Sequence, residues 1–424
     1  MKIAIVGTGI AGNLAAYRLS LEHDLVVYEA GGHVGGHTHT HEVEQAGRRY
    51  HVDTGFIVFN DWTYPNFIGL LDELGVASQA SSMSFSVRDE RSGVEYNGTS
   101  LNTLFAQRRN LLRPTFLRMI RDILRFNREA PALLGSPGEG PSLGEYLADG
   151  GYAREFIEHY ILPMGAAIWS TAPEHIERFP ARFFIRFFHH HGMLSVDERP
   201  QWRVIRGGSA RYVEPLTAPF RDRIRLNTPV EWVRRLPGHV VVKSCDHEAE
   251  KFDALFLACH SDEALALLSD ASPVEREVLG AIPYQRNEAV LHTDSRLLPR
   301  AKRAWGAWNY HVPAAPRSRV ALTYNMNILQ SLDSPEPFLV TLNHSESIDP
   351  ARILKRIAYD HPLYTAQGVA AQARQRELNG WQRTYFCGAY WRNGFHEDGV
   401  TSALAALEHF TEDQRAQRPL YRTG

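Results

Sequence analysis

A glycine-rich turn between a strand and a helix opens the chain and constrains its fold more than any other feature. Residues 1–30 read MKIAIVGTGIAGNLAAYRLSLEHDLVVYEA, with three turn glycines spaced as G-x-G-x-x-G. The pattern predicts a short buried strand over 3–6, an alanine- and leucine-rich helix, and a second strand over 24–28. Two strands joined through a helix form a βαβ unit, so the sequence predicts an α/β fold built on a parallel sheet.

The residues of this turn favour a bound dinucleotide over a purely structural role. Gly7 allows the tight turn, Gly9 lets the backbone approach a pyrophosphate, and Gly12 lets the helix pack closely on the sheet. The helix begins at Ile10 and Ala11, and its first N–H groups are directed at the phosphates. An acid at the end of the second strand completes the pattern.

That acid selects among dinucleotides. Glu29 is positioned to accept hydrogen bonds from a ribose 2′-OH, and its charge repels a 2′-phosphate. The sequence therefore argues against an NADP-type ligand.

A second glycine run follows Glu29 and carries a family resemblance. Residues 29–40 read EAGGHVGGHTHT, and residues 53–56 read DTGF. These segments resemble the flavin amine oxidase superfamily, which includes protoporphyrinogen oxidases and phytoene desaturases. Its members follow the ribose-binding Glu with a motif like ARxRVGGR-[ST] and place a D-x-G turn against the flavin. The resemblance implies FAD, with contacts from Glu29, Ala30, Gly35, Gly36, His37, Thr38, Gly55 and Phe56.

Histidines stand at two positions where the superfamily usually has arginine, His33 and His37. A neutral imidazole donates one hydrogen bond but brings less charge than a guanidinium. We expect His37 to contact a phosphate, with simple coverage of the loop as the alternative. No metal site is predicted, because the histidine run contains no Cys and no cluster of carboxylates.

The resemblance reappears in a second block, as expected for a cofactor domain interrupted by insertions. Residues 202–211 read WRVIRGGSAR, like the glycine turn that precedes a helix in the family. A strand follows in which Val230 is expected to give a backbone contact to the adenine. Residues 252–268 read FDALFLACHSDEALALL, which resembles the strand, small-residue turn and helix of the family.

A third block lies at 384–407 and reads TYFCGAYWRNGFHEDGVTSALAAL. An apolar strand ends at Gly388, and after a loop a helix opens at Asp398, Gly399 and Val400. The N-terminus of that helix would stabilise negative charge on the reduced flavin. Cys387 lies inside the strand and not at the position where some relatives tether the flavin, so we expect noncovalent FAD.

The three blocks define the predicted domains. We predict a Rossmann-type FAD-binding domain formed by residues 1–59, 199–267 and 376–424, with an inserted α+β substrate domain formed by 60–198 and 268–375. A hairpin is expected over 84–96. The substrate cavity is expected between the two domains, because clefts between domains are common ligand sites.

Candidate catalytic residues come from the second insertion and the last loop. Amine oxidases of the superfamily place a Lys near flavin N5, but the corresponding strand here offers Asn287 and Glu288 and no Lys. They also flank the flavin with two aromatic side chains, and Tyr390 and Trp391 lie in that stretch. Glu288 or Tyr310 is predicted as the base that takes a proton if a C=C bond forms.

These departures weaken an assignment to amine oxidation. The chain resembles a bacterial group of FAD proteins linked to cyclopropane and methylated fatty-acid synthesis. We expect a hydride to pass from a hydrophobic substrate, a lipid acyl chain, to flavin N5, which amounts to desaturation. A flavin amine oxidase, a redox-neutral FAD-dependent isomerase and a non-enzymatic flavin-binding partner of a lipid-modifying enzyme are the alternatives.

Composition restricts the binding partners and the cellular compartment that we expect for this protein. The 46 basic and 48 acidic residues give a net charge of −2, so no general basic field would hold nucleic acid. Three scattered cysteines fit a reducing compartment, and no apolar run reaches the ~18 residues that a membrane span needs. We expect a cytoplasmic protein.

A basic amphipathic helix is predicted over 114–128. At ~100° per residue, four arginines form one stripe, Arg118, Arg121, Arg125 and Arg128. The opposite side carries Phe116, Leu117, Ile120, Ile123 and Leu124. The favoured interpretation is a core-facing apolar side with solvated arginines. The alternative is peripheral contact with the inner face of an anionic membrane, with the FFIRFF segment at 183–188 admitting a lipid.

Overall fold

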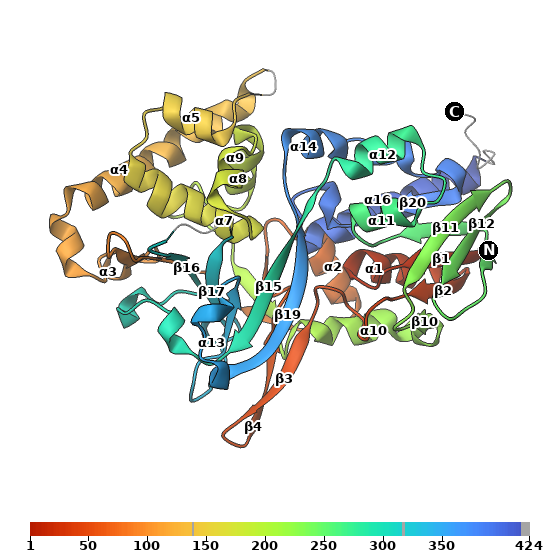
Figure 1. Cartoon of the computed structure of the whole chain (residues 1–424), viewed down its shortest axis with the longest axis horizontal. Coiled ribbons are helices and arrows are strands. Elements are labelled where there is room, and N and C mark those ends of the chain that lie inside the picture. The colour runs from red at the N-terminus through yellow and green to blue at the C-terminus, as the bar shows by residue number, and fades with distance from the viewer. Residues whose placement is uncertain (138–139, 316–318, 417–424) are drawn as a thin grey trace.

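The computed structural model describes residues 1–137, 140–315 and 319–416 and consists of two parts (Figure 1). One part contains a parallel sheet together with the N-terminus and the last helix. The other contains a larger mixed sheet and the helices from α3 to α9. The long strands β15 (Tyr284–His292) and β19 (Ile353–Pro362) lie where the two parts meet.

Five strands from three distant segments form the parallel sheet, in the order β10–β2–β1–β14–β20. All neighbouring pairs are parallel. The strands span Lys2–Val6 (β1), Asp24–Tyr28 (β2), Ile224–Arg225 (β10), Ala254–Leu257 (β14) and Thr384–Phe386 (β20). The predicted βαβ unit and the α/β, Rossmann-type fold class are confirmed.

Both faces of this sheet are covered, which explains why its strands read as unbroken apolar runs. On one face, Ile3 and Ile5 share a core with α1 (Ile10–Leu19), α10 (Val213–Thr217) and α16 (His396–Arg415). On the other face, Ala4 and Val6 share a core with α11 and with an antiparallel sheet. These elements span Ser261–Leu267 (α11), Val230–Leu236 (β11), His239–Ser244 (β12) and Glu250–Phe252 (β13).

Segments predicted to belong to the substrate domain also pack on this sheet. Helix α2 (Pro65–Glu73) shares the core of α1, and α12 (Pro273–Gly280), α14 (Ala366–Gln372) and α15 (Gln375–Leu378) cover the opposite face. The predicted borders at 60, 268 and 375 therefore do not follow the packing. An amphipathic pattern shows that a helix has an apolar face, but not which sheet covers it.

The second part is built on a seven-stranded sheet in the order β19–β15–β18–β17–β16–β7–β8. Strands β16 and β7 are parallel, and the other neighbours are antiparallel. The hairpin expected over 84–96 is confirmed by β7 and β8. The remaining elements span Phe85–Asp89 (β7), Glu95–Asn97 (β8), Trp308–Val312 (β16), Ala321–Asn325 (β17), Met326–Leu329 (α13) and Leu339–Leu342 (β18).

Seven helices accompany this sheet around an aromatic core. They span Leu101–Leu104 (α3), Pro114–Glu129 (α4), Leu143–Asp149 (α5), Arg154–Phe156 (α6), Leu162–Trp169 (α7), Pro173–Glu177 (α8) and Ala181–His190 (α9). The phenylalanines of the FFIRFF segment lie on α9 and are buried, so this segment does not offer a lipid-facing surface. Within the described ranges, no helix has both the length and the apolar character needed to cross a bilayer.

Helix α4 packs through a different face from the one predicted. Its buried side chains are Phe116, Met119, Asp122 and Phe126. The prediction that Leu117 and Leu124 belong to the core is wrong, because both are exposed. The buried Asp122 explains the rotation: its carboxylate accepts a hydrogen bond from the Ala153 N–H at 2.8 Å and holds that side of the helix inward.

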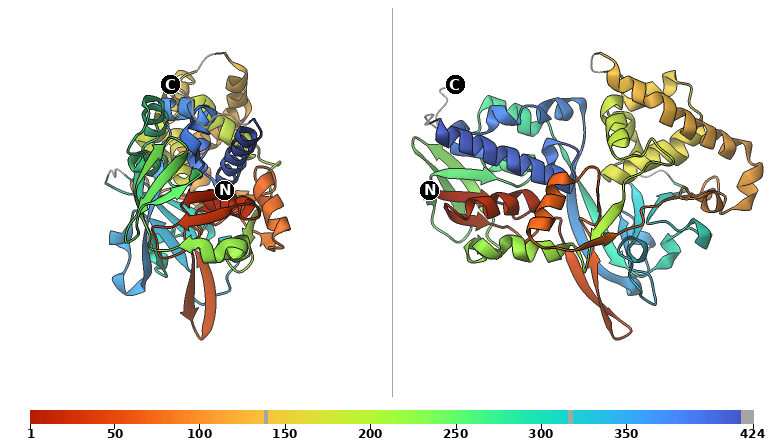
Figure 2. Two further views of the ribbon diagram at one scale, coloured as in Figure 1. Left: turned by 90° about the vertical axis from the view of Figure 1, so that its right-hand side faces the viewer. Right: turned by 180° about the vertical axis from the view of Figure 1, so that it is seen from behind.

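Two smaller sheets link the parts. The hairpin of β3 (Thr40–Gln45) and β4 (Arg48–Asp53) projects from the molecule (Figure 2). Strand β9 (Trp202–Ile205) pairs with β5 (Phe59–Asn60) and β6 (Ser78–Ala80). At the base of the hairpin, the Asp53 carboxylate accepts the Ser209 N–H at 2.9 Å. This bond joins the D-x-G turn to the glycine turn that follows β9.

Candidate active site

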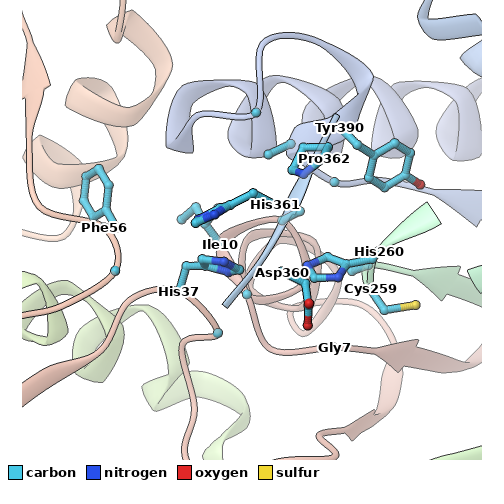
Figure 3. Close-up of a pocket in the computed structure, with 18 of the residues that line it drawn as sticks. Gly7, Ile10, His37, Phe56, Cys259, His260, Asp360, His361, Pro362 and Tyr390 are labelled. Carbon is cyan, nitrogen blue, oxygen red and sulfur yellow. The ribbon is translucent and has the colours of Figure 1, made fainter. Parts of the chain in front are cut away.

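A cavity of about 690 Å³ lies at the carboxyl ends of the parallel strands, where open α/β sheets bind their ligands. One wall is formed by the end of β1, the start of α1 and residues 35–37, and the opposite wall comes from the mixed sheet and α7. Figure 3 shows side chains from both walls directed into this space. Its volume falls within the ~300–1,000 Å³ of small-molecule and cofactor sites.

The three glycines of the first turn have separate roles. Gly7 has φ +101°, and a Cβ there would lie 2.9 Å from the Ala258 carbonyl oxygen. A Cβ on Gly12 would lie 2.0 Å from the Gly7 carbonyl oxygen, so the helix can pack this close only with glycine. A Cβ on Gly9 would meet no described atom within 4 Å. The chain itself requires Gly7 and Gly12, whereas the space at Gly9 is left for a ligand.

Glu29 is held rigidly at the end of β2. Its carboxylate accepts the Thr8 N–H at 3.0 Å and the Gly31 N–H at 2.8 Å, and the Thr8 hydroxyl donates to the same carboxylate. The side chain lines the cavity. A fixed carboxylate at this position can accept hydrogen bonds from ribose hydroxyls.

Most of the predicted cofactor residues line the cavity. They are Gly7, Gly9, Ile10, Ala11, Glu29, Ala30, Gly35, Gly36, His37, Gly55, Phe56, Val230 and Gly388. They come from three distant blocks of sequence, which the parallel sheet brings to one edge.

Five predicted cofactor residues are placed behind the cavity wall. Gly12 packs against the turn, Val400 is buried in the core, and a Cβ on Gly399 would lie 2.7 Å from Ile10 Cγ2. Thr38 Oγ1 lies 2.6 Å from the Tyr212 hydroxyl. Asp398 accepts the Phe395 N–H at 2.9 Å. These five residues support the residues that form the cavity wall.

The last helix begins earlier than predicted. Helix α16 starts at His396, two residues before Asp398, so the Asp398 carboxylate lies within the first turn and accepts the N–H of the N-cap residue Phe395. His396 stacks on Phe56 with ring centroids 3.6 Å apart, and both line the cavity. The start of α16 is thereby joined to the D-x-G turn.

His37 belongs to a group of imidazoles at the cavity. Its ring centroid lies 5.5 Å from that of His361 and 6.1 Å from that of His260, and it stacks on Tyr359 at 4.9 Å. Figure 3 shows His37, His260 and His361 around the same space. The buried Nε2 of His37 has no hydrogen-bond partner among the described residues. An anion beside the glycine turn would supply that partner.

The environment keeps these imidazoles neutral. Burial, followed by the nearby His361 and His260, lowers the pKa of His37 well below its ordinary value. Burial lowers the pKa of His361 to about 4 and that of His396 to about 3. Unfolded histidines titrate near 6.5. The stability gained by keeping these groups neutral is therefore present above pH 6.5 and is lost as the pH falls towards about 4.

The other histidines of the same run lie outside this group. The rings of His33 and His39 stack with centroids 4.0 Å apart, and those of His39 and His41 lie 4.1 Å apart. No three His, Cys, Asp or Glu side chains within the described part of the chain are arranged to hold a metal ion.

Three of the four predicted catalytic residues are not brought to the cavity. The side chain of Glu288 is 39% exposed, pairs with Arg356 at 2.8 Å and does not line the cavity. The Ser345 hydroxyl and then Arg356 lower the pKa of Glu288, the opposite of what a buried base needs. Tyr310 lines a separate cleft. The structure thus contradicts the expectation that Glu288 or Tyr310 faces the flavin site as a base.

The two aromatic residues of the last loop have different positions. Tyr390 lines the cavity, whereas Trp391 is buried in the core behind it. Their rings lie 5.0 Å apart and are tilted by 40°. They do not form a pair of facing rings around one substrate. Burial raises the pKa of Tyr390 well above its ordinary value, so its phenol stays protonated.

The far end of the cavity is lined by aromatic residues that sequence reasoning missed. They come from separate elements and are Trp169, Trp308, Tyr324, Tyr364 and Phe395. Trp308 and Tyr324 meet edge to face with centroids 5.1 Å apart. Trp308 Nε1 and the Tyr364 hydroxyl are buried without hydrogen-bond partners among the described residues. Only their aromatic character marks these residues in the sequence.

His361 was also missed, and a buried amide network fixes its orientation. The Asn343 amide donates to Asn287 Oδ1 at 2.8 Å, so the Asn287 Nδ2 is left to donate to His361 Nδ1 at 2.8 Å. His361 therefore carries its proton on Nε2. In the sequence, Asn287 is notable only because it lies on the strand where a lysine is expected. In the structure, it acts as a positioning residue for an imidazole in the cavity wall.

These features fit FAD. The space at Gly9, the fixed carboxylate of Glu29 and the unpartnered Nε2 of His37 match a diphosphate and a ribose, and the aromatic end suits a flavin and an apolar substrate. No lysine is among the described residues that line the cavity.

Comparison with known proteins identifies the family. The family described as flavin containing amine oxidoreductase matches residues 10–293, about two thirds of the chain. The chain belongs to this family. It is an FAD-dependent oxidoreductase of the amine oxidase superfamily, as its sequence motifs predicted.

Solved structures share the fold over nearly the whole chain. Cyclohexylamine oxidase from Brevibacterium oxydans IH-35A is 15% identical, with a TM-score of 0.71 over 98% of this chain and 99% of the other. The CLA-producing fatty acid isomerase from P. acnes is 18% identical, with a TM-score of 0.67 over 96% and 98%. Putrescine oxidase bound to putrescine is 14% identical, with a TM-score of 0.66 over 97% and 99%. No curated protein matches the sequence.

We predict that FAD binding takes up a proton through His37. The diphosphate charge raises the pKa of a neighbouring imidazole that is neutral in the empty cavity, so binding should tighten as the pH falls from 8 to about 6. Calorimetric titration of apo-protein with FAD at pH 6, in buffers of different ionisation enthalpy, should show net proton uptake. His37→Gln should remove the uptake, and His33→Gln should not. Equal binding enthalpies in both buffers for the wild type would refute this coupling.

We also predict that Asn287→Asp changes the protonation of His361. A carboxylate in place of the donating amide favours a proton on Nδ1 and should raise the pKa of His361 from about 4 by one unit or more. ¹⁵N NMR of labelled histidines across a pH series reads both the tautomer and the pKa. Asn102→Asp, an exposed substitution, serves as the control. An unchanged His361 signal in Asn287→Asp would show that Asn287 does not set the tautomer.

Proposed function

We propose that this enzyme oxidises an uncharged hydrophobic chain, with a lipid acyl group as the substrate class and desaturation as the reaction. One observation carries the proposal: the end of the cavity away from the glycine turn is lined by apolar and aromatic side chains. The described residues there, Ile57, Val58, Ile168, Trp169, Ser170, Trp308, Tyr324, Tyr364 and Phe395, include no charged group. Burying an alkyl chain against such a wall contributes about 0.8 kcal/mol per methylene.

The charged groups of the cavity lie at the opposite end. Glu29 is at the ribose position, Glu263 lies 3.8 Å from His260, and Asp360 lies beside His37 and His260 near the glycine turn (Figure 3). A substrate with its own charge at the aromatic end would lose hydration without gaining an opposite charge. The electrostatics of the cavity therefore favour a neutral substrate segment next to the flavin.

Desaturation removes two hydrogens from the chain, one as a hydride and one as a proton, and the bound flavin would supply the acceptor for both as it becomes fully reduced. The protein holds the substrate carbon in a water-poor space, because aromatic side chains from α7, β16 and β17 close that end. His361 presents an Nε2–H donor and Tyr390 a protonated phenol, so both can donate hydrogen bonds at neutral pH. The fatty acid isomerase among the structural neighbours supports the idea that this fold accommodates an acyl chain.

Amine oxidation is the second candidate. Aromatic faces can bind an ammonium group, and Trp308 and Tyr324 stand at the uncharged end. The family description and the neighbouring cyclohexylamine and putrescine oxidases support this candidate. The edge-to-face geometry of Trp308 and Tyr324 and the tilt of Tyr390 against Trp391 differ from a cage of two facing rings.

We predict that a phospholipid with a methylated or unsaturated acyl chain bleaches the flavin absorbance of the holoenzyme anaerobically. Trp308→Ala should slow this reduction by about tenfold or more, because loss of a buried aromatic contact removes at least ~1.4 kcal/mol of binding to the substrate chain. Trp62→Ala, an exposed tryptophan outside the cavity, is the matched control. Glu288→Gln should leave the rate unchanged.

Other substrates separate the candidates. Bleaching by cyclohexylamine or putrescine but not by the phospholipid would replace the proposal with amine oxidation. Conversion of the lipid without consumption of an electron acceptor would identify an isomerase. A flavoprotein that neither lipid nor amine reduces would contradict both oxidative candidates.

A further inference from the structure

Exposed leucines are concentrated at one end of the molecule. Leu101 and Leu112 have relative exposures of 76% and 88%, and Leu111, Leu117 and Leu124 have exposures between 44% and 53%. All five lie on α3, on the 3₁₀ helix Arg108–Leu112, or on α4. Single exposed leucines are ordinary in folded proteins. A group on consecutive elements marks an interaction surface.

On α4 the exposed leucines alternate with arginines. Leu117, Arg121, Leu124 and Arg128 follow one another at intervals of four, three and four residues, which places them on one face of the helix. That face is turned away from the buried residues, because Met119 and Phe126 point into the core. The leucines are therefore neither part of the core nor covered by another described element.

The same segment carries a strong local charge. Residues 101–129 contain seven arginines and only two acidic residues, Asp122 and Glu129. Asp122 is buried on the packed side of α4 and lies 3.3 Å from Arg121, and Glu129 pairs with Arg128 at 2.8 Å. Seven arginines against two acids still leave the segment with a net charge of +5. Exposed arginines accompany the leucines on two of these elements, Arg108 and Arg109 on the 3₁₀ helix and Arg118, Arg121 and Arg128 on α4. The whole chain has a net charge of −2, so this positive charge is a local feature.

The segment also has an accessible position. Helices α3 and α4 form the end of the molecule farthest from the parallel sheet and from the N-terminus, as all views that show both ends agree (Figures 1 and 2). A flat partner could approach this end without meeting the rest of the protein.

We propose that this leucine–arginine surface, formed by Leu101, Leu111, Leu112, Leu117, Leu124 and the exposed arginines of 108–128, docks on an anionic lipid bilayer. Leucine side chains enter the boundary between headgroups and acyl chains, and arginines bind phosphate and carboxylate groups of the lipids. A second copy of the chain is a poorer partner. A symmetric dimer through this patch would bring two groups of arginines against each other.

Vesicle binding by the purified holoenzyme tests the proposal independently of any enzymatic activity. Phosphatidylcholine vesicles with about a third of phosphatidylglycerol should pellet the protein at low salt, and pure phosphatidylcholine should not, because arginines are attracted to the negative charge of the anionic surface. Leu111→Ser, Leu112→Ser, Leu117→Ser and Leu124→Ser combined should lower the partition coefficient at least tenfold. Arg118→Gln, Arg121→Gln and Arg128→Gln combined should do the same and reduce the salt dependence.

Matched substitutions elsewhere serve as controls. Leu21→Ser and Leu354→Ser remove exposed leucines outside the patch and should leave binding unchanged. Flavin absorbance and thermal unfolding confirm that each variant is folded. No binding to anionic vesicles, or equal binding by the leucine variant, would overturn the proposal. So would a wild-type dimer that the leucine variant converts to monomer, since the patch would then be an interface between two copies.

Discussion

The close contact between the start of α1 and the end of β1 determines where everything else in the cofactor part can lie. The Gly7 carbonyl oxygen occupies the space in which any side chain on Gly12 would have to sit. The carbonyl oxygen of Ala258, the residue after β14, would lie only 2.9 Å from a Cβ on Gly7. Helix α16 then approaches Ile10 through Gly399. The turn after β1, the residue after β14 and the first turn of α16 therefore meet in close contact. Gly9 differs from Gly7 and Gly12, because a Cβ there would meet no described atom within 4 Å and the space beside it stays open.

The cofactor end and the substrate end of the cavity are built by different means. At the first end the chain uses glycines, backbone N–H groups and one fixed carboxylate, so the shape follows from short local motifs. At the second end it uses aromatic side chains from α7, β16 and β17. Strands β16 and β17 pair with each other, but α7 is separated from them by more than a hundred residues of sequence and meets them only through tertiary packing.

This difference explains what the sequence could predict. The βαβ unit, the split parallel sheet and the hairpin of β7 and β8 each have a local signature of turn residues and periodicity. Glu288 shows what such local patterns do not predict. Its neighbour Asn287, and not Glu288, is directed towards the cavity residue His361. Side chains alternate between the two faces of a strand, and the choice of face depends on pairing with β18 and β19. The rotation of α4 depends likewise on a tertiary bond, from the Ala153 N–H to Asp122.

The split of the parallel sheet has a consequence for the order of folding. Strand β14 pairs with β1 across some 250 residues of sequence, and β20 joins only through Leu255 and its neighbours. Such long-range pairings form slowly, because the entropy cost of closing a long loop must be met before the stabilising contacts form. During synthesis the complete G-x-G-x-x-G motif emerges first, yet the cavity wall is not finished until His396 has been added. Capture of the cofactor is thus a late event. Until then, the apolar strands that flank the site lack the packing that protects them from aggregation.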